Sequence, residues 1–218
     1  MNPPPLSQRL SDLRSRHARE RQHVASAYDR MVETLVVRGV AACALGVGDS
    51  IPPFALPNAD GRFVHSANLL ASGPLVLSFY RGSWCFYCGS ELSALRDAHP
   101  GIVAAGGRVV AVAGEAGGRN AATKRDFGLP FDVLCDIDLG LSLSFGLVFP
   151  VDEEVRAIYR EIGFDLARFN GNDSWFLPIP ATYVVATDGR IAAAHVDPDF
   201  RNRMEPADIV ATLLALGR

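Results

Sequence analysis

Apolar residues along this chain alternate between short continuous runs and stripes at helical spacing. The continuous runs are typical of strands covered on both faces, and they occupy residues 75–80, 108–113, 131–135, 181–186 and 191–196. Helical spacing occupies residues 91–96, 120–127 and 151–162, and Pro206 opens a last helix. Because strands and helices alternate and the last two strands form an antiparallel hairpin, the pattern predicts an α/β domain with a central mixed sheet flanked by helices.

The first part of the chain has a different pattern, which is helical from about Leu6 to Leu45. Five apolar residues fall on one face at helical spacing: Val24, Tyr28, Met31, Val32 and Leu35. Glycines and prolines at 46–53 then end the helical pattern. We therefore expect residues 1–45 to form an N-terminal helical extension and residues 46–218 to form the α/β domain.

Local signals predict turns and helix ends within that domain. Asp60-Gly61 and Asp188-Gly189 are typical of the turns of two β-hairpins. Pro100 predicts a break in the helix that follows residue 88. Asp138 is expected to cap a short helix that runs to Phe145.

Charge and hydropathy exclude some classes of partner. The formal net charge is −3, whereas proteins that bind nucleic acid usually carry a basic surface. No apolar run is long enough to cross a bilayer, and the first residues lack the basic-then-apolar order of a secretory signal. We therefore expect a cytoplasmic protein that binds neither nucleic acid nor a membrane. Disulfides in that compartment are usually transient and catalytic.

The strongest chemical signal is the Cys85-Phe86-Tyr87-Cys88 sequence, which lies between a buried strand and a helix. Helix N-termini present unpaired N–H groups and a positive dipole end, so a thiolate there is stabilised and its pKa falls to about 3.5–7.5. The two-residue spacing allows both sulfurs to meet within one helical turn, so that a disulfide can form and break. Trp84 is expected to shield one sulfur from water.

A metal site is the competing interpretation of the cysteine pair. Structural zinc usually requires four ligands, and the remaining candidates are scattered at Cys43, Cys135, His65, His99 and His195. We therefore expect a redox pair, with no metal and no cofactor. Cys43 and Cys135 are expected to be ordinary buried thiols, with Cys135 as an alternative resolving thiol.

A second signal is Pro180, which opens the strand at 181–186. Most X–Pro bonds are trans, but a cis bond here would place a backbone edge against the cysteine pair. Because of that pair, the sequence favours a cis bond before Pro180.

These segments resemble the peroxiredoxin-like redoxins of the alkyl hydroperoxide reductase / thiol-specific antioxidant (AhpC/TSA) family, within the thioredoxin superfamily. The resemblance covers nearly the whole chain, and the segments that carry it are 47–52, 79–88, 134–136, 180–185 and 188–191. It implies a thioredoxin-like fold and an antioxidant oxidoreductase that reduces peroxides through a CxxC dithiol/disulfide cycle.

The residues that would be carried over from the family are in conflict. In the Pro-x-x-x-Thr-x-x-Cys motif of peroxiredoxins, Arg81 takes the Pro place, Cys85 the Thr place and Cys88 the peroxidatic place. Pro180 stands where peroxiredoxins use an arginine, while Trp84-Cys85 and Pro180 match thioredoxins. Arg81 is a candidate replacement for that arginine, because a guanidinium lowers a thiol pKa and donates hydrogen bonds; a surface cation at the strand end is the alternative.

Several questions therefore stay open at the level of sequence. The catalytic candidates are Cys85, Cys88, Arg81, Trp84 and Pro180, and the order in which the cysteines attack is not fixed. Two alternatives to a peroxidase are a thioredoxin-like disulfide oxidoreductase and a non-catalytic interaction module. The expected partners are a peroxide or disulfide substrate and a cellular dithiol of the thioredoxin or glutathione type, with a homodimer as an open option.

Overall fold

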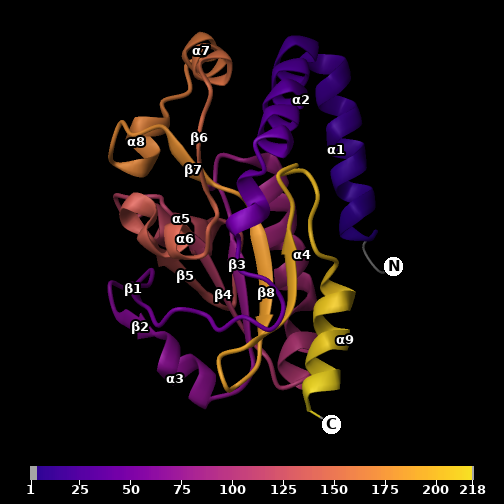
Figure 1. The fold of residues 1–218 in the computed structure, drawn as a ribbon, viewed down its shortest axis with the longest axis vertical. Coiled ribbons are helices and arrows are strands. Elements are labelled where there is room, and N and C mark those ends of the chain that lie inside the picture. Colours follow the sequence, from indigo (N-terminus) through magenta and orange to yellow (C-terminus); the bar gives the residue numbers. More distant parts are fainter. Residues whose placement is uncertain (1–3, 218) are drawn as a thin grey trace.

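The computed structural model describes residues 4–217 and confirms a thioredoxin-like α/β fold (Figure 1). Residues 1–3 of the expected extension and residue 218 lie outside the described residues. The central sheet has five strands in the order β5-β4-β3-β8-β9. These strands are β3 (Leu75–Phe79), β4 (Arg108–Ala113), β5 (Asp132–Cys135), β8 (Ala181–Val185) and β9 (Ile191–Val196). The first three strands are parallel, and β8 runs antiparallel to both β3 and β9.

Helices cover both faces of this sheet, as the continuous apolar strands require. Every residue of β3 and of β8 is buried. The helices of the domain are α3 (Ser66–Ala71), α4 (Phe86–Ala104), α5 (Arg119–Asp126), α6 (Gly140–Ser144), α7 (Glu153–Glu161), α8 (Leu166–Asn170) and α9 (Pro206–Leu216). Two small antiparallel sheets are formed by β1 (Ala55–Pro57) with β2 (Phe63–His65) and by β6 (Val148–Pro150) with β7 (Phe176–Pro178). The turns at Asp60-Gly61 and Asp188-Gly189 connect β1 to β2 and β8 to β9, as predicted.

The N-terminal segment forms a helical hairpin rather than one long helix. Helix α1 (Leu6–Glu20) and helix α2 (Gln22–Val37) are joined at Arg21, whose backbone leaves the helical region (φ −142°, ψ 56°), and a short 3₁₀ turn (Val40–Cys43) follows. The hairpin packs against α4 and α7 (Figure 1). Three leucines of α1 belong to the main core: Leu6, Leu10 and Leu13.

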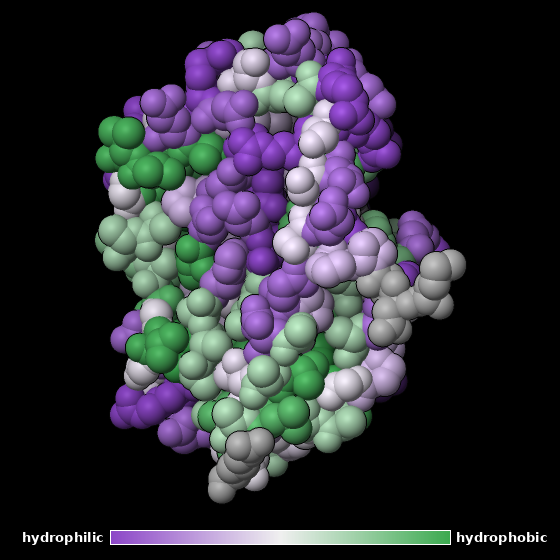
Figure 2. All heavy atoms as spheres, turned by 90° about the vertical axis from the view of Figure 1, so that its right-hand side faces the viewer, coloured by the Kyte–Doolittle hydropathy of each residue, from purple (hydrophilic) through white to green (hydrophobic). Residues whose placement is uncertain are grey.

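Two polar contacts attach the hairpin to the C-terminal part of the chain. The Glu205 carboxylate accepts the backbone N–H groups of Leu6 (3.1 Å) and Ser7 (2.6 Å), which have no partner within α1. The Arg201 guanidinium donates to Asp29 of α2 at 2.6 Å. Figure 2 shows the face that carries α1 and α9, which is hydrophilic around the hairpin and more hydrophobic over α9.

Two expectations about helix ends were wrong. Helix α4 continues through Pro100 to Ala104, because its last turns are held by packing against α9, where Ile102 is fully buried. The side chain that binds the N-terminus of α6 is Asp136, not Asp138. Asp138 has a left-handed backbone (φ 57°) and is exposed, whereas the Asp136 carboxylate accepts from Leu141 N–H at 2.8 Å.

Between residues 4 and 217, none of the helices combines the length and the apolar character that a transmembrane span needs.

The assignment of Asp136 as the side chain that caps α6 can be tested by making the same substitution at Asp136 and at Asp138. Asp136 is buried and also accepts the N–H and hydroxyl of Ser142, at 2.8 and 2.7 Å. We expect Asp136→Asn to lower the free energy of unfolding by about 2 kcal/mol, because an amide presents a donor to buried donors. The matched change Asp138→Asn should cost less than about 0.5 kcal/mol. Urea unfolding measures both, and equal losses would contradict this assignment.

Candidate active site

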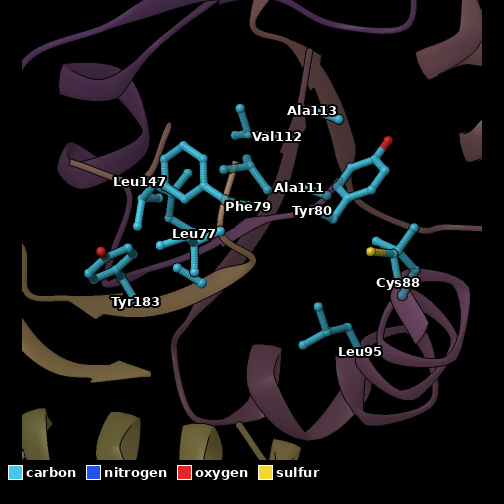
Figure 3. Packing of buried hydrophobic residues seen from close by; sticks show 14 of the residues in the cluster. Leu77, Phe79, Tyr80, Cys88, Leu95, Ala111, Val112, Ala113, Leu147 and Tyr183 are labelled. Atoms are coloured by element: carbon cyan, nitrogen blue, oxygen red, sulfur yellow. The ribbon is translucent and has the colours of Figure 1, made fainter. Parts of the chain in front are cut away.

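The two cysteines lie at the start of α4, after the loop that follows β3. Cys85 occupies the N-cap position of α4 (φ −89°, ψ 112°), and Cys88 lies in its first turn. Both are free thiols and both are buried, with exposed fractions of 4 % and 0 %. In Figure 3 the Cys88 sulfur points from α4 toward the sheet, between Tyr80 and Leu95. Both sulfurs are therefore close to the helix N-terminus and shielded from water, the surroundings in which a thiol pKa shifts most.

A buried carboxylate holds the loop before the pair. Glu115 accepts the backbone N–H of Ser83 at 2.9 Å and its hydroxyl at 2.8 Å. Burial raises the pKa of Glu115, although both Ser83 groups oppose this. Gly82 has a φ of +152°, and a Cβ there would lie 2.2 Å from Nε1 of Trp84. Only glycine therefore allows the indole ring to lie against this loop.

Arg81 is buried beside the cysteines rather than exposed at the strand end. Arg81 is only 2 % exposed. Nη2 donates to the Tyr159 hydroxyl at 3.2 Å, and the guanidinium carbon lies 3.9 Å from the centre of the Phe200 ring and 4.8 Å from that of Trp84. A guanidinium stays charged at any ordinary pH and is stabilised by such aromatic faces. The site thus contains a permanent buried cation.

A second buried arginine faces Cys88. Arg203, from the loop between β9 and α9, donates from Nε to Glu91 at 2.7 Å, and its Nη2 lies 3.5 Å from the Cys88 sulfur. Glu91 of α4 also accepts the Thr182 hydroxyl at 3.0 Å. The three side chains form a buried network that joins α4, β8 and the C-terminal loop behind Cys88.

The two thiols have opposite pKa shifts. Burial by itself raises the pKa of Cys85, but a hydrogen bond with Cys88 and the charges of Arg81 and Arg203 outweigh it and lower the pKa to about 5. The pKa of Cys88 is raised well above its usual value, first by burial and then by its hydrogen bond and charge repulsion with Cys85. At neutral pH this arrangement favours a Cys85 thiolate that accepts a hydrogen bond from a Cys88 thiol.

Cys85 lines a cavity next to the α1–α2 hairpin. A cavity of about 140 Å³ is bounded by Cys85, Arg81 and Trp84 on one side and by the α1–α2 hairpin on the other. Cys88 is not among the residues that line it. A small molecule that enters the cavity therefore meets Cys85 first.

The prediction of a cis bond before Pro180 was wrong. Across residues 4–217 every peptide bond is trans. Ile179 donates its N–H to the Leu147 carbonyl at 2.7 Å, so the segment is already fixed as an extended continuation of the β6–β7 pairing. A trans bond is the lower-energy state of X–Pro, and nothing in this environment opposes it. Pro180 is buried at the start of β8 and does not line the cavity.

The other cysteines lie apart from this arrangement. The half-buried Cys135 thiol donates to the backbone carbonyl of Glu115 at 3.1 Å, and Cys43 is exposed rather than buried as expected. In the part of the chain that the structure describes, no group of three or more His, Cys, Asp or Glu side chains is placed to hold a metal ion.

Sequence reasoning missed Arg203, Tyr159 and Phe200. All three come from segments far from the cysteine pair in sequence, and none has a local pattern that marks it. The buried ion pair between Arg203 and Glu91 likewise depends on the tertiary fold. A buried arginine on the C-terminal loop was therefore visible only in the structure.

Comparison with known proteins agrees with this architecture. The sequence pattern of the AhpC/TSA family matches residues 47–194. Peroxiredoxin Q, chloroplastic, of Sedum lineare is 32% identical over 89 residues, which are 41% of this chain and 47% of that protein. The chain thus spans about half the length of the curated relatives it matches.

Solved structures show the same fold at low sequence identity. Peroxidoxin BcpB from Mycobacterium tuberculosis superposes with a TM-score of 0.62 and 19% identity, over 78% of this chain and 97% of that one. Peroxiredoxin Q of Xanthomonas campestris gives a TM-score of 0.56 and 16% identity, over 75% and 89%. With the match to residues 47–194, which is more than half of its length, this chain belongs to the AhpC/TSA family.

Proposed function

We propose that this chain is a thiol-dependent peroxidase that reduces a hydroperoxide through Cys85 and Cys88. The observation that carries the proposal is a buried cysteine that lines a cavity beside a buried arginine, and the nearby charges lower the pKa of that cysteine to about 5. Membership of the AhpC/TSA family and similarity to proteins named peroxiredoxin Q support it.

The proposed cycle uses both thiols in a fixed order. The Cys85 thiolate attacks the terminal oxygen of ROOH, so that an S–O bond forms, the O–O bond breaks and the alkoxide leaves as ROH after taking a proton. Cys85 is then a sulfenic acid. The Cys88 thiol attacks that sulfur, its proton leaves with the hydroxyl group as water, and a Cys85–Cys88 disulfide forms. An external dithiol supplies the two electrons that restore both thiols.

The residues around Cys85 have distinct proposed roles. Arg81 stabilises the thiolate and donates N–H groups to the peroxide oxygens. Trp84 forms part of the cavity wall and excludes water, while Arg203 and Glu91 fix Cys88. Pro180 only begins β8, and no chemical step is assigned to it. This order departs from the family motif, in which the place of Cys88 is the peroxidatic one, because Cys88 is the thiol with the raised pKa.

Disulfide exchange with a protein substrate is less favoured. A protein disulfide would have to reach Cys85, which is 4 % exposed and covered by the α1–α2 hairpin. The trans bond before Pro180 removes one of the features that suggested thioredoxin-like exchange. A non-catalytic module would gain nothing from the buried charges that lower the pKa of Cys85.

The reductant and the compartment are proposed from the chemistry of the cycle. The reductant is a dithiol of the thioredoxin type or a thiol such as glutathione. The compartment is a reducing one such as the cytoplasm, where that reductant is abundant. A homodimer stays an open option.

Serine variants test the order of attack. Reduced wild-type protein should consume one equivalent of hydroperoxide and lose two thiols. Cys88→Ser should also consume one equivalent and leave a sulfenic acid on Cys85, trapped with dimedone and located by mass spectrometry. Cys85→Ser should consume none.

Cys135→Ser provides the matched control for these variants and should behave as the wild type. Consumption by Cys85→Ser but not by Cys88→Ser would reverse the order. No consumption by any variant or by the wild type would refute the peroxidase proposal.

The role of Arg81 predicts a pH dependence. A lowered thiol pKa means that the reactive thiolate is lost as the pH falls through about 5 and is nearly complete at pH 7. Arg81→Met should raise the apparent pKa of Cys85 by about 1–3 units, because the nearby cation is removed. The alkylation rate of Cys85 by iodoacetamide at pH 6 should then fall about tenfold.

Arg81→Lys keeps the charge and should shift the midpoint less. Circular dichroism establishes that each variant is folded. An unchanged midpoint near pH 5 in folded Arg81→Met would assign the shift to Arg203 and the helix N-terminus instead.

A further inference from the structure

Glu115 is a buried carboxylate that the proposed cycle does not use. It follows the end of β4 after Gly114 and is 1 % exposed. Among the residues that the structure describes, no cation forms an ion pair with it. Burial of a carboxylate is costly unless an opposite charge or hydrogen bonds compensate for it, and here hydrogen bonds provide the compensation.

Both of these hydrogen bonds go to the same residue. One carboxylate oxygen of Glu115 accepts the backbone N–H of Ser83 at 2.9 Å, and the other accepts the Ser83 hydroxyl at 2.8 Å. Two bonds to one carboxylate fix the orientation of the bound group as well as its position. Ser83 lies midway between Arg81 and Cys85 in the sequence. Glu115 therefore holds the middle of the segment that carries the buried cation and the proposed nucleophile.

The segment from residue 81 to residue 85 depends on anchors outside itself. It contains Gly82 at a φ of +152°, and glycine gives a backbone the most conformational freedom. Its start is held at Tyr80, whose N–H donates to the Val112 carbonyl of β4 at 3.0 Å (Figure 3). The bonds from Ser83 to Glu115 attach the segment to the chain beyond β4 a second time, three residues later.

The other partner of the sulfur is fixed from different elements. The Arg81 guanidinium donates to Tyr159 of α7 and lies against the ring of Phe200. The separation between the guanidinium and the Cys85 sulfur is therefore set by the path of the backbone between them. Charges interact strongly where water is excluded, so a small displacement of this backbone changes the stability of a thiolate.

The charge of Glu115 acts in the opposite direction to its hydrogen bonds. Burial raises the pKa of Glu115, and the negative charge of Cys85 adds to this rise. The same repulsion disfavours the thiolate. A residue that acted on Cys85 only by its charge would therefore make the thiolate less stable, whereas a residue that holds the segment in place makes it more stable.

We propose that Glu115 is a positioning residue for Cys85, whose carboxylate holds Ser83 so that the Cys85 thiolate stays close to the Arg81 guanidinium. The inference rests on the proposed peroxidase function, because it concerns the nucleophile of that cycle. Glu115 does not touch the substrate and takes part in no bond that forms or breaks.

Three substitutions separate the hydrogen bonds from the charge. Glu115→Ala removes both, and we expect it to raise the apparent pKa of Cys85 from about 5 by about one unit. Glu115→Gln removes only the charge, because the amide oxygen accepts the Ser83 N–H and the amide NH₂ donates to the hydroxyl; the pKa should stay at or below the wild-type value. Ser83→Ala removes one of the two bonds and should raise the pKa by less than Glu115→Ala.

The measurement is the pH dependence of Cys85 alkylation by iodoacetamide, located by mass spectrometry, with circular dichroism to establish folding. In Glu115→Ala the rate should be about twofold below wild type at pH 6 and equal to it at pH 8, where the thiolate is complete in both. A loss of general stability alone would not give this pH-dependent difference.

Asp136→Ala provides the matched control. Asp136 is also 1 % exposed, and its carboxylate also accepts backbone N–H groups and a serine hydroxyl, from Leu141 and Ser142. This variant should unfold more easily but leave the pKa of Cys85 unchanged. An equal rise in Asp136→Ala would overturn the inference.

Two further results would contradict the positioning role of Glu115. One is a Cys85 pKa at or below the wild-type value in folded Glu115→Ala, and the other is a rise in Glu115→Gln as large as that in Glu115→Ala. If Glu115→Ala does not fold, Ser83→Ala decides, and no rise in that variant counts against the proposal. Hydroperoxide consumption by the wild type tests the peroxidase proposal separately, because alkylation needs no peroxide.

Discussion

The proposed chemistry depends on one constraint, which is that a charged sulfur must be stable at Cys85 although this side chain is buried. Desolvation opposes the thiolate, and the structure offsets it with the Cys88 thiol and two guanidinium groups. These two cations are not equivalent. Arg203 is already paired with Glu91, whereas Arg81 has no carboxylate partner in the described part of the chain. A buried cation without a counter-charge is costly, so the Cys85 thiolate completes an ion pair that the fold otherwise leaves open.

Placing Arg81 in this way requires segments from both ends of the chain. Its guanidinium group contacts Tyr159 of α7 and Phe200 of the C-terminal loop, and the Phe200 ring packs edge-on against Tyr28 of α2. The ion pair between Arg201 and Asp29, with the cap of α1 by Glu205, holds these segments together. The helical hairpin is therefore part of the chemical environment of Cys85, and loss of its docking would expose both the cation and the sulfur to water.

The sequence was sufficient where a signal is local. Continuous apolar runs predicted the strands of the central sheet. The Asp60-Gly61 sequence predicted a hairpin turn, and Gly61 adopts the positive φ (76°) that such a turn requires. The sequence did not predict the features that depend on tertiary contacts. Helix α4 continues past Pro100 because its last turns pack against α9. The bond before Pro180 is trans in a segment that is already extended. The burial of Arg81 and the approach of Arg203 to Cys88 join distant segments, so no pattern within a sequence window could reveal them.

In the proposed cycle the opposite pKa shifts of the two thiols divide the chemistry between them. One hydrogen bond stabilises Cys85 as an acceptor and Cys88 as a donor, so the same interaction lowers the pKa of the first and raises that of the second. In that cycle Cys88 keeps the proton that leaves with the hydroxyl group as water when the disulfide forms. Because Cys85 is the N-cap residue of α4 and Cys88 lies in its first turn, that step needs little backbone movement. In the proposed cycle Cys88 is a poor first nucleophile because its pKa is raised, and a suitable second one because the sulfenic acid on Cys85 would form within its reach.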